Sequence, residues 1–418
     1  MTVSSHVAIV GAGPYGLSIA SHLQARGIDF RIFGRPLRTW RECMPMGMFL
    51  KSEGFASNLY DPDGICSLAS YCVENGLPYR DFNSPISLDT FTSYALSFQT
   101  RLVPNVEDKS VIALRPAEEG FILELDDGEM VTARRVVVAV GVSHFGHIPP
   151  ELVHLPGRVL SHSSDHRDLS EFKSRNVSVI GGGSSALDVV ASLRSVGADV
   201  QLIARRQALR WNLPAPPRPA WRRWPPLSEL GGGWRNYFFV NAPMLFGFLP
   251  QSVRMHIVRA SLGPAGGWPA KDSVERAPLL LGHTIRQAIC DGSGVHLDLI
   301  GPSGEERIVR TDYVIAATGY KVDLRRLAFL QDFGVRGVEH TPILSANFES
   351  SMPGLYFVGL ASANTFGPAM RFLVGARYTA QKLARHFAAA DSRHMPLPAR
   401  RYALPTRRTH VAADTGER

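Results

Sequence analysis

Short, mainly apolar runs recur along the chain and predict strands that are buried on both faces. They lie at residues 7–10, 136–141, 177–180, 313–320 and 354–359. Each run contains or directly precedes a glycine. Continuous apolar runs of this kind are typical of parallel sheets that helices cover on both sides. We therefore expect an α/β protein in which strands end at sharp turns.

Other stretches predict a hairpin and two helices. Residues 111–138 alternate between apolar and polar positions around the turn DDGE at 126–129, a pattern that indicates antiparallel strands. Residues 87–102 place apolar side chains at helical spacing, with Asp89 as a helix-start residue. Residues 375–387 predict the final helix in the same way.

Two of the strand-glycine junctions carry the same glycine-rich fingerprint. Each follows a predicted buried strand, opens an amphipathic helix and precedes a second strand about 20 residues later, which is the context that a GxGxxG/A dinucleotide motif requires. The first glycine permits the tight turn, the second lets the backbone approach a pyrophosphate, and the third lets helix and strand pack closely. The motifs are VAIVGAGPYG, with Gly11, Gly13 and Gly16, and VSVIGGGSSALD, with Gly181, Gly183 and Ala186.

Two fingerprints in one chain predict two dinucleotides, and electron transfer from a nicotinamide to a flavin is the chemistry that this pair suggests. We expect two Rossmann-like dinucleotide-binding domains, with the NADPH domain inserted into the FAD domain. The first part of the FAD domain is predicted at 1–155 and its second part at 313–390, where the C-terminal strands would rejoin the first sheet. The NAD(P)H domain is predicted at 156–312, with a Pro/Trp-rich cap segment near 211–272. A basic tail is predicted at 391–418.

Composition is that of an ordinary globular protein. The 418 residues are 45% apolar and 20% charged, and no apolar run is long enough to span a membrane. The first strand begins by Val7, so no signal peptide is expected and the predicted location is cytoplasmic. None of the four cysteines forms a CxxC pair, so we expect reduced, mostly buried thiols and no metal site. A disulfide reductase would need such a pair.

The net charge is +8, and arginine supplies much of the positive charge. Arg205 and Arg206 directly follow the strand that comes after the helix of the second fingerprint. An acid there would bind the 2′-hydroxyl of NADH, whereas arginine accommodates the 2′-phosphate of NADPH. The two arginines therefore favour NADPH, and a solvated basic turn is the alternative. No nucleic-acid module is visible, so no nucleic-acid partner is expected.

Residues 237–250 form the most apolar stretch, broken by two prolines and an asparagine. This stretch predicts either a cap over a pocket, which we favour, or a surface that contacts lipid.

The order of these motifs resembles the flavin-containing monooxygenases, with their Baeyer–Villiger and N-hydroxylating relatives, among the two-dinucleotide-binding flavoproteins. The similarity covers most of residues 5–385 and rests on the two fingerprints, the strand ends VAVG and ATGY, the linker before the second fingerprint, and the closing motif GLYFVG…FGPxxR…GARYTA.

Two departures from that group stand out, and a third feature departs from the reductases instead. The linker places Gly157 one residue too far from His162, and His166 occupies an aromatic position; both histidines are expected to be linker residues rather than catalysts. The place of the acid that binds the FAD ribose reads FGR, residues 33–35, so the ribose is expected to be held in another way. Leu360 follows Gly359 where many reductases have aspartate, as also in flavin-containing monooxygenases.

The fingerprints and the resemblance together predict the site residues. Asn58 is the catalytic candidate, with a turn or helix-cap role as its alternative. The helix after Gly367 and Pro368 is expected to face the flavin with its N-terminus. Trp40 and Lys51 have core packing and surface exposure as their alternatives. The full cofactor-binding set is Gly11, Gly13, Pro14, Tyr15, Gly16, Arg35, Trp40, Lys51, Ser52, Gly141, Gly181, Gly183, Ser184, Ser185, Ala186, Arg205, Arg206, Thr318, Gly319, Gly359, Phe366, Gly367 and Pro368.

The resemblance implies an FAD-dependent, NADPH-using monooxygenase that inserts one oxygen atom from O2 into a small organic substrate through a C4a-(hydro)peroxyflavin. An NAD(P)H-dependent flavin reductase or oxidase is the first alternative, and a non-catalytic nucleotide-sensing protein is the second. The expected partners are a small-molecule substrate and O2, and the sequence leaves homo-oligomer formation open.

Overall fold

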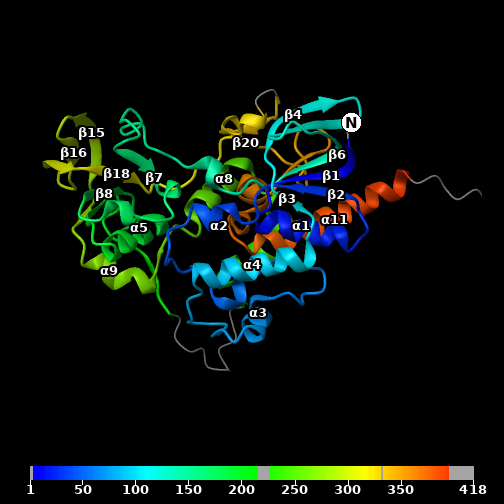
Figure 1. The fold of residues 1–418 in the computed structure, drawn as a ribbon, viewed down its shortest axis with the longest axis horizontal. Helices are drawn as coiled ribbons and strands as arrows, with labels where there is room; N and C mark the ends of the chain where they lie inside the picture. Colours follow the sequence, from blue (N-terminus) through cyan, green and yellow to red (C-terminus); the bar gives the residue numbers. More distant parts are fainter. Residues whose placement is uncertain (1–2, 215–225, 331–332, 395–418) are drawn as a thin grey trace, which may run out of the picture.

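The computed structural model describes residues 3–214, 226–330 and 333–394. Residues 215–225 of the predicted cap segment and the predicted tail from residue 395 onward lie outside these ranges. Two sheets occupy separate halves of the molecule, with β1, β2 and β6 in one half and β8, β18 and β7 in the other (Figure 1).

The first sheet has seven strands and is built from both ends of the described chain. Its order is β3-β2-β1-β6-β5-β4, and β21 pairs in parallel with β6. The DDGE turn joins β5 and β6 as the predicted antiparallel hairpin. The strands are β1 Val3–Val10, β2 Phe30–Phe33, β3 Val106–Glu107, β4 Val111–Ala117, β5 Gly120–Leu125, β6 Met130–Val138 and β21 Leu355–Phe357.

Helices from distant parts of the sequence accompany this sheet. The C-terminal helix α11 lies against α1, the helix of the first fingerprint (Figure 1). Ser87 caps α4, because its side chain accepts a hydrogen bond from the Thr90 N–H, and the predicted helix-start residue Asp89 lies in the first turn. The helices are α1 Pro14–Gln24, α2 Arg38–Glu42, α3 Leu68–Glu74, α4 Leu88–Leu102, α10 Ala363–Phe366 and α11 Gly375–His394. Because α11 continues to His394, residues 391–394 are helical rather than part of a tail.

The second half contains a five-stranded parallel sheet and an antiparallel sheet of three strands. The parallel order is β14-β9-β8-β18-β7, with β8 and β9 as the strands of the second fingerprint. The elements are β7 Leu160–His162, β8 Asn176–Ile180, α5 Ser184–Ser195, β9 Asp199–Ala204, α9 Lys271–Glu275, β14 Leu279–Leu281, β15 Thr284–Asp291, β16 Gly294–Ile300, β17 Glu306–Thr311 and β18 Tyr313–Ala316.

This arrangement confirms the predicted fold class, two Rossmann-like units in an α/β protein. The expectation that the strand at residue 313 returns to the first sheet is wrong, because β18 pairs with β8 and β7 in the second sheet. Of the later runs, β21 alone among the described strands rejoins the first sheet. The remaining domain boundaries stay a prediction.

The described part of the cap segment folds into short elements that lie in sequence between β9 and β14 of the second sheet. These are β10 Trp211–Asn212, β11 Leu227–Ser228, β12 Gly231–Gly232, α6 Trp234–Asn241, α7 Pro243–Phe246, α8 Gln251–Ala260 and β13 Gly266–Gly267. A further two-stranded pair, β19 Gly337–Val338 and β20 Thr341–Pro342, lies after β18 in the chain.

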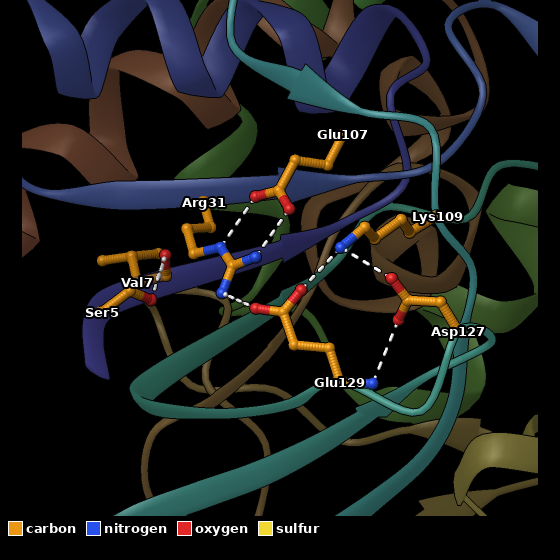
Figure 2. A network of polar contacts seen from close by, with 7 residues as sticks. All are labelled: Ser5, Val7, Arg31, Glu107, Lys109, Asp127 and Glu129. Atoms are coloured by element: carbon orange, nitrogen blue, oxygen red, sulfur yellow. Dashed lines mark hydrogen bonds and ion pairs between the residues drawn. The ribbon is translucent and has the colours of Figure 1, made fainter. Parts of the chain in front are cut away.

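An ion-pair network fixes the edge of the first sheet (Figure 2). Arg31 of β2 binds Glu107 of β3 through Nε and Nη2 at 2.7 and 2.6 Å, and its Nη1 binds Glu129 at 2.8 Å. Lys109 also binds Glu129, at 2.6 Å. These bonds raise the pKa of Arg31 and hold the pKa of Glu129 below its usual range. The short strand β3 is thereby held beside β2 at the edge where the first nucleotide site begins.

Candidate functional site

The turn of the first fingerprint requires glycine at two positions for reasons within the protein itself. Gly11 has φ +117°, and a Cβ there would lie 2.4 Å from the Ala139 carbonyl oxygen. A Cβ on Gly16 would lie 1.9 Å from the Gly11 carbonyl oxygen. Both contacts are far inside the normal van der Waals distance, so β1, α1 and β6 reach their close packing because these side chains are absent.

Gly13 differs, because a Cβ built on it would meet no protein atom within 4 Å. Gly13 is also the N-cap of α1, and no side chain caps that helix start. A helix N-terminus with free N–H groups and open space in front of it suits an anionic pyrophosphate. The residues of this turn therefore fit the pyrophosphate of FAD.

Tyr15 connects this helix start to the C-terminal part of the chain. Its hydroxyl donates to the carbonyl oxygens of Met370 and Phe372 at 3.0 and 2.9 Å. Burial raises the pKa of Tyr15 well above its ordinary value. A Cβ on Gly375 would lie 2.1 Å from this hydroxyl, and one on Gly359, where φ is +65°, would lie 3.7 Å from the ring. Tyr15 thus positions the first turn, and its hydroxyl is fully used by the protein.

The end of β2 has an arrangement that the sequence did not reveal. Gly34 has φ +126° and donates its N–H to the Glu107 carbonyl oxygen at 2.9 Å. The chain therefore has a turn that favours glycine at the place where a ribose-binding acid was expected and is absent from the sequence. Arg35 binds Glu42 of α2 at 2.8 Å and approaches Asp108 at 3.6 Å. Two carboxylates therefore lie at this edge although neither occupies the usual position in the sequence. We propose Glu42 and Asp108 as the candidate acids for an adenosine ribose at this edge.

Three predicted flavin-side residues make local contacts in this structure. Trp40 packs on Phe91, with ring centroids 4.5 Å apart, and the Ser52 hydroxyl lies 2.7 Å from that of Ser57. Asn58 uses both ends of its amide, donating to the Phe55 carbonyl and accepting from the Leu68 N–H, each at 2.8 Å. Leu68 begins α3, so these bonds favour the helix-cap role for Asn58 over catalysis.

Lys51 bridges the two halves of the molecule. Its Nζ donates to Asp188 Oδ1 at 2.8 Å and to the Phe49 carbonyl at 2.7 Å. Asp188 belongs to α5, the helix of the second fingerprint, and its side chain is 8% exposed. Burial raises the pKa of Asp188, and the Lys51 ammonium opposes that shift. The predicted contact of Lys51 with the flavin stays a prediction.

The closing motif forms tight turns rather than the expected continuous helix. After Gly367, where φ is +92°, a short 3₁₀ turn covers Pro368–Arg371, and Phe372 is extended before α11 starts. The helix predicted directly after Pro368 is therefore wrong. Phe366 stacks on Phe348 with centroids 3.9 Å apart, and a Cβ on Gly367 would lie 3.1 Å from Phe246 of α7. The cap segment thus packs on this turn.

The second fingerprint repeats the backbone geometry of the first. Gly181 has φ +140°, and a Cβ there would lie 2.3 Å from the Ala317 carbonyl oxygen. The small Ala186 packs at the third position, 3.5 Å from that Cβ, as a GxGxxA motif requires. Ser184 and Ser185 open α5, whose N-cap Gly183 has no side-chain cap. In contrast to Gly13, a Cβ on Gly183 would lie 3.2 Å from the Pro264 ring.

Three arginines follow β9 near this second turn, one more than the sequence analysis identified. Arg205 is exposed, whereas Arg206 passes over Gly182 and donates from Nη1 to the Pro264 carbonyl at 3.1 Å. Burial, followed by the neighbouring Arg210, lowers the pKa of Arg206. Arg210 is the residue that was missed, and its signal was available in the spacing RRxxxR at the end of β9. Uncompensated positive charge at this strand end suits the 2′-phosphate of NADPH.

Linker histidines organise the end of β18. The His147 N–H donates to the Gly319 carbonyl at 2.9 Å, and the Thr318 hydroxyl donates to the His147 carbonyl. His162 lies with Nε2 3.1 Å from the same Gly319 carbonyl and accepts the Ser164 N–H on Nδ1. Burial lowers the pKa of His162, so the neutral ring is the form that makes these bonds. This supports the predicted linker role.

Gly141, at the end of the β6 run, has φ +72°, and a Cβ there would have the Thr39 hydroxyl oxygen at 3.9 Å as its neighbour.

All four cysteines are free, and Cys72 is buried while Cys43, Cys66 and Cys290 are partly exposed, so the thiols are less buried than expected. Within the described ranges, no three His, Cys, Asp or Glu side chains gather as a metal site. No helix among the described residues is long and apolar enough to cross a membrane.

Comparison with known protein families decides the class. The model of the family "Pyridine nucleotide-disulphide oxidoreductase" matches residues 8–216, half of the chain, and includes both fingerprints. The chain belongs to this family. Membership confirms a flavoprotein oxidoreductase with two dinucleotide cofactors, FAD and NADPH, and it confirms the family-level resemblance seen in the sequence.

Individual relatives point to two kinds of activity. The chain is 28% identical to ferredoxin–NADP reductase 1 of Cupriavidus pinatubonensis, over 50% of this chain and 53% of the relative. It is also 28% identical to indole-3-pyruvate monooxygenase YUCCA1 of Oryza sativa subsp. japonica, over 47% of each. The aligned part thus spans about half the length of these relatives. The fold matches ornithine hydroxylase from Pseudomonas aeruginosa with a TM-score of 0.73 and 19% identity, over 93% of this chain and 99% of that one.

Proposed function

We propose that this protein is an NADPH-dependent FAD monooxygenase that inserts one atom of O2 into a small organic substrate. In the balanced reaction, substrate, O2, NADPH and a proton give the oxygenated substrate, water and NADP⁺. Bound FAD would supply the redox chemistry, by accepting a hydride from NADPH and passing electrons to O2. The protein's contribution is to bind the two dinucleotides, to orient them and to exclude water.

The roles of the residues follow from the geometry. The N-terminus of α1 and the open space at Gly13 would hold the FAD pyrophosphate. Arg205, Arg206 and Arg210 would hold the 2′-phosphate of NADPH. Catalysis of this kind depends on positioned cofactors more than on a general base, which agrees with an Asn58 amide that is engaged by backbone groups.

The observation that carries the monooxygenase proposal is the packing of the cap segment on the closing motif. Phe246 of α7 contacts Gly367, and Phe239 of α6 packs on Phe246 with centroids 6.0 Å apart. An apolar cover beside the predicted flavin turn suits a small substrate held away from water. A reductase that serves a protein such as ferredoxin needs an open approach instead.

The cap also indicates the substrate class. The acidic residues of the cap segment are Glu229 and Asp272, whereas Arg235, Arg254 and Arg259 are among its basic residues. Glu229 is paired with Arg377 at 2.7 Å, so a substrate ammonium buried there would have to compete for this carboxylate, which is costly. We propose an apolar or anionic substrate with a nucleophilic heteroatom or a ketone, rather than a free diamine.

The test is isotopic. Purified protein with FAD is supplied with NADPH and ¹⁸O2 in the presence of arylalkyl sulfides, aromatic 2-oxo acids, ketones, and ornithine or cadaverine as cationic controls. We expect ¹⁸O in an apolar or anionic product and a fall in H2O2 formed per NADPH when that substrate is present. No labelled product from any of these substrates, together with rapid NADPH-driven reduction of ferredoxin, would establish the reductase alternative that the Cupriavidus relative suggests.

A further inference from the structure

The two fingerprints differ at the glycine that should approach the pyrophosphate. The space in front of Gly13 is open, but the corresponding space at Gly183 is taken by the Pro264 ring, 3.2 and 3.3 Å from a Cβ position at two of its carbons. The second glycine of the motif is where the backbone approaches the phosphates. In this structure Pro264 therefore lies where the second dinucleotide should place its pyrophosphate.

Pro264 belongs to a short segment, residues 262–267, which we call the strap. Both ends of the strap are held. Arg371 binds the carbonyl oxygens of Val258 and Ser261 just before it, at 3.0 and 3.2 Å. At its other end Gly266 donates its N–H to the Arg210 carbonyl at 2.9 Å, within the β10–β13 pair. The middle of the strap is thus the part that can lift while its anchors stay in place.

The middle of the strap is held by an arginine of the predicted phosphate site. Arg206 Nη1 donates to the Pro264 carbonyl at 3.1 Å, and no carboxylate pairs with Arg206 among the described residues. Leu262 has φ +50°, which is unfavourable for a non-glycine residue, and Gly263 follows it. The closed position of the strap is therefore stabilised by a single hydrogen bond to a neutral acceptor and destabilised by a strained residue, so opening it should need little free energy.

We propose that the strap closes the NADPH site and that Arg206 exchanges partners, from the Pro264 carbonyl in the closed state to the 2′-phosphate in the bound state. In the closed state the Arg206 guanidinium donates to a neutral carbonyl, whereas a phosphate offers it a charged acceptor with several oxygens, so NADPH replaces the lost bond and NADH does not. The inference rests on the proposed binding of the 2′-phosphate by the arginines at the end of β9. It adds that one of these arginines also holds the site closed.

Partner exchange gives a prediction with opposite signs for two ligands. The need to open the strap lowers the affinity for NAD⁺ and NADP⁺ by the same factor, because both bind the open state. Arg206→Ala removes the closing bond for both ligands but removes the phosphate contact for NADP⁺ only. We therefore expect the variant to bind NAD⁺ about two- to tenfold more tightly, the range for one neutral hydrogen bond, and to bind NADP⁺ about tenfold more weakly.

Two variants serve as controls. Arg205 makes no described contact with the strap, so Arg205→Ala should weaken NADP⁺ binding and leave NAD⁺ binding unchanged. Pro264→Gly keeps the carbonyl acceptor but removes Cβ and Cγ, the two Pro264 atoms that approach Gly183, so it should tighten both ligands by the same factor and leave their ratio unchanged. The proline variant also tests the strap if Arg206→Ala fails to fold.

The measurement is isothermal titration of FAD-loaded, full-length protein with NAD⁺ and NADP⁺, which involves no turnover. Unchanged or weaker NAD⁺ binding in Arg206→Ala would reduce that residue to a phosphate ligand and overturn the exchange. Pro264→Gly without effect on either ligand would overturn the strap itself. The predicted pattern of affinities without any oxygenated product would keep this inference and remove only the monooxygenase proposal.

Discussion

The ion pair between Lys51 and Asp188 offers a quantitative test of how the two halves of the molecule are held together. Lys51→Met removes the ammonium and keeps most of the stem. It leaves the Asp188 carboxylate buried, at 8% exposure, with its one described partner gone. Breaking a buried pair in this way typically costs about 3–5 kcal/mol. Lys51 is itself 22% exposed, so the site is near water and we expect about 2–3 kcal/mol here.

The two other variants of the cycle separate charge from packing. Asp188→Asn should cost about 1 kcal/mol, because Lys51 keeps its bond to the Phe49 carbonyl and can reach water. The double variant Lys51→Met with Asp188→Asn leaves no buried charge, so it should recover about 1–2 kcal/mol relative to Lys51→Met alone.

The pH dependence of the free energy of unfolding gives an independent test, because the direction of the change can be predicted. Burial raises the pKa of Asp188, and removing Lys51 removes the influence that opposes this shift. A carboxyl whose folded-state pKa is raised lowers the stability of the fold progressively as the pH rises from its unfolded-state pKa to its folded-state pKa, and protonation relieves this cost as the pH falls through the same range. The stability difference between Lys51→Met and wild type should therefore narrow as the pH falls from about 7.5 toward about 5.

The assay is urea denaturation of FAD-loaded protein followed by circular dichroism at several pH values, with free FAD held constant because bound ligand adds stability. The matched control is Lys51→Met made in the Asp188→Asn background, since neither of these two proteins has the carboxyl and the difference in stability between them should not vary with pH. A Lys51→Met protein within about 0.5 kcal/mol of wild type at every pH would show that the pair behaves as a surface contact, and our interpretation of its burial would be refuted.

Four further predictions follow from the site. Gly13→Ala should raise the FAD dissociation constant at least about tenfold, while the melting temperature of the apo protein stays within about 2 °C because the new Cβ meets no protein atom. Gly16→Ala should instead unfold the apo protein, because its Cβ would lie 1.9 Å from a carbonyl oxygen. Equal losses of melting temperature in the two variants would contradict this distinction. Arg205→Ala should reduce kcat/KM for NADPH in anaerobic flavin reduction about tenfold and leave that for NADH unchanged, and a wild type indifferent to the 2′-phosphate would remove the assignment. Glu42→Gln should weaken FAD binding about three- to tenfold in a fluorescence titration if Glu42 supplies the missing ribose acceptor, with Glu74→Gln, a distant ion-paired acid, as control. Burial lowers the pKa of His22, His144, His147, His162 and His166, so the folded state favours their neutral forms. Their contribution to the free energy of unfolding should be complete above about pH 6.5 and should be lost as the pH falls below it. In thermal melts, His162→Gln should reduce the dependence of the melting temperature on pH in this range.

The features that sequence could predict are those whose physical requirements are local. The turn at Gly11 needs a positive φ and a missing Cβ, and both needs are visible as a glycine between an apolar strand and a helix. The hairpin at residues 126–129 and the helix from Leu88 are local for the same reason. The number of dinucleotide units and the fold class follow directly from such signals.

Pairing between strands is not local, and there the prediction failed. The runs at 313–316 and 355–357 look alike in sequence, since both are short and apolar and both precede a glycine. One pairs with β8 and the other with β6. Hydrophobic periodicity reports how deeply a strand is buried but not which sheet it joins, so the boundary near residue 313 could not be settled from pattern alone.

The same limit applies to the arginines that we propose as the ligands of the 2′-phosphate. Their position after β9 was enough to predict the 2′-phosphate as a partner, because charge at a strand end depends only on the local sequence. The contact between Arg206 and Pro264 joins residues 58 positions apart, through a segment with no recognisable motif. A residue that binds a ligand must have some other partner when the ligand is absent, and that second partner affects affinity as much as the first. Sequence identifies the partner that chemistry makes obvious, and only the fold reveals the competitor.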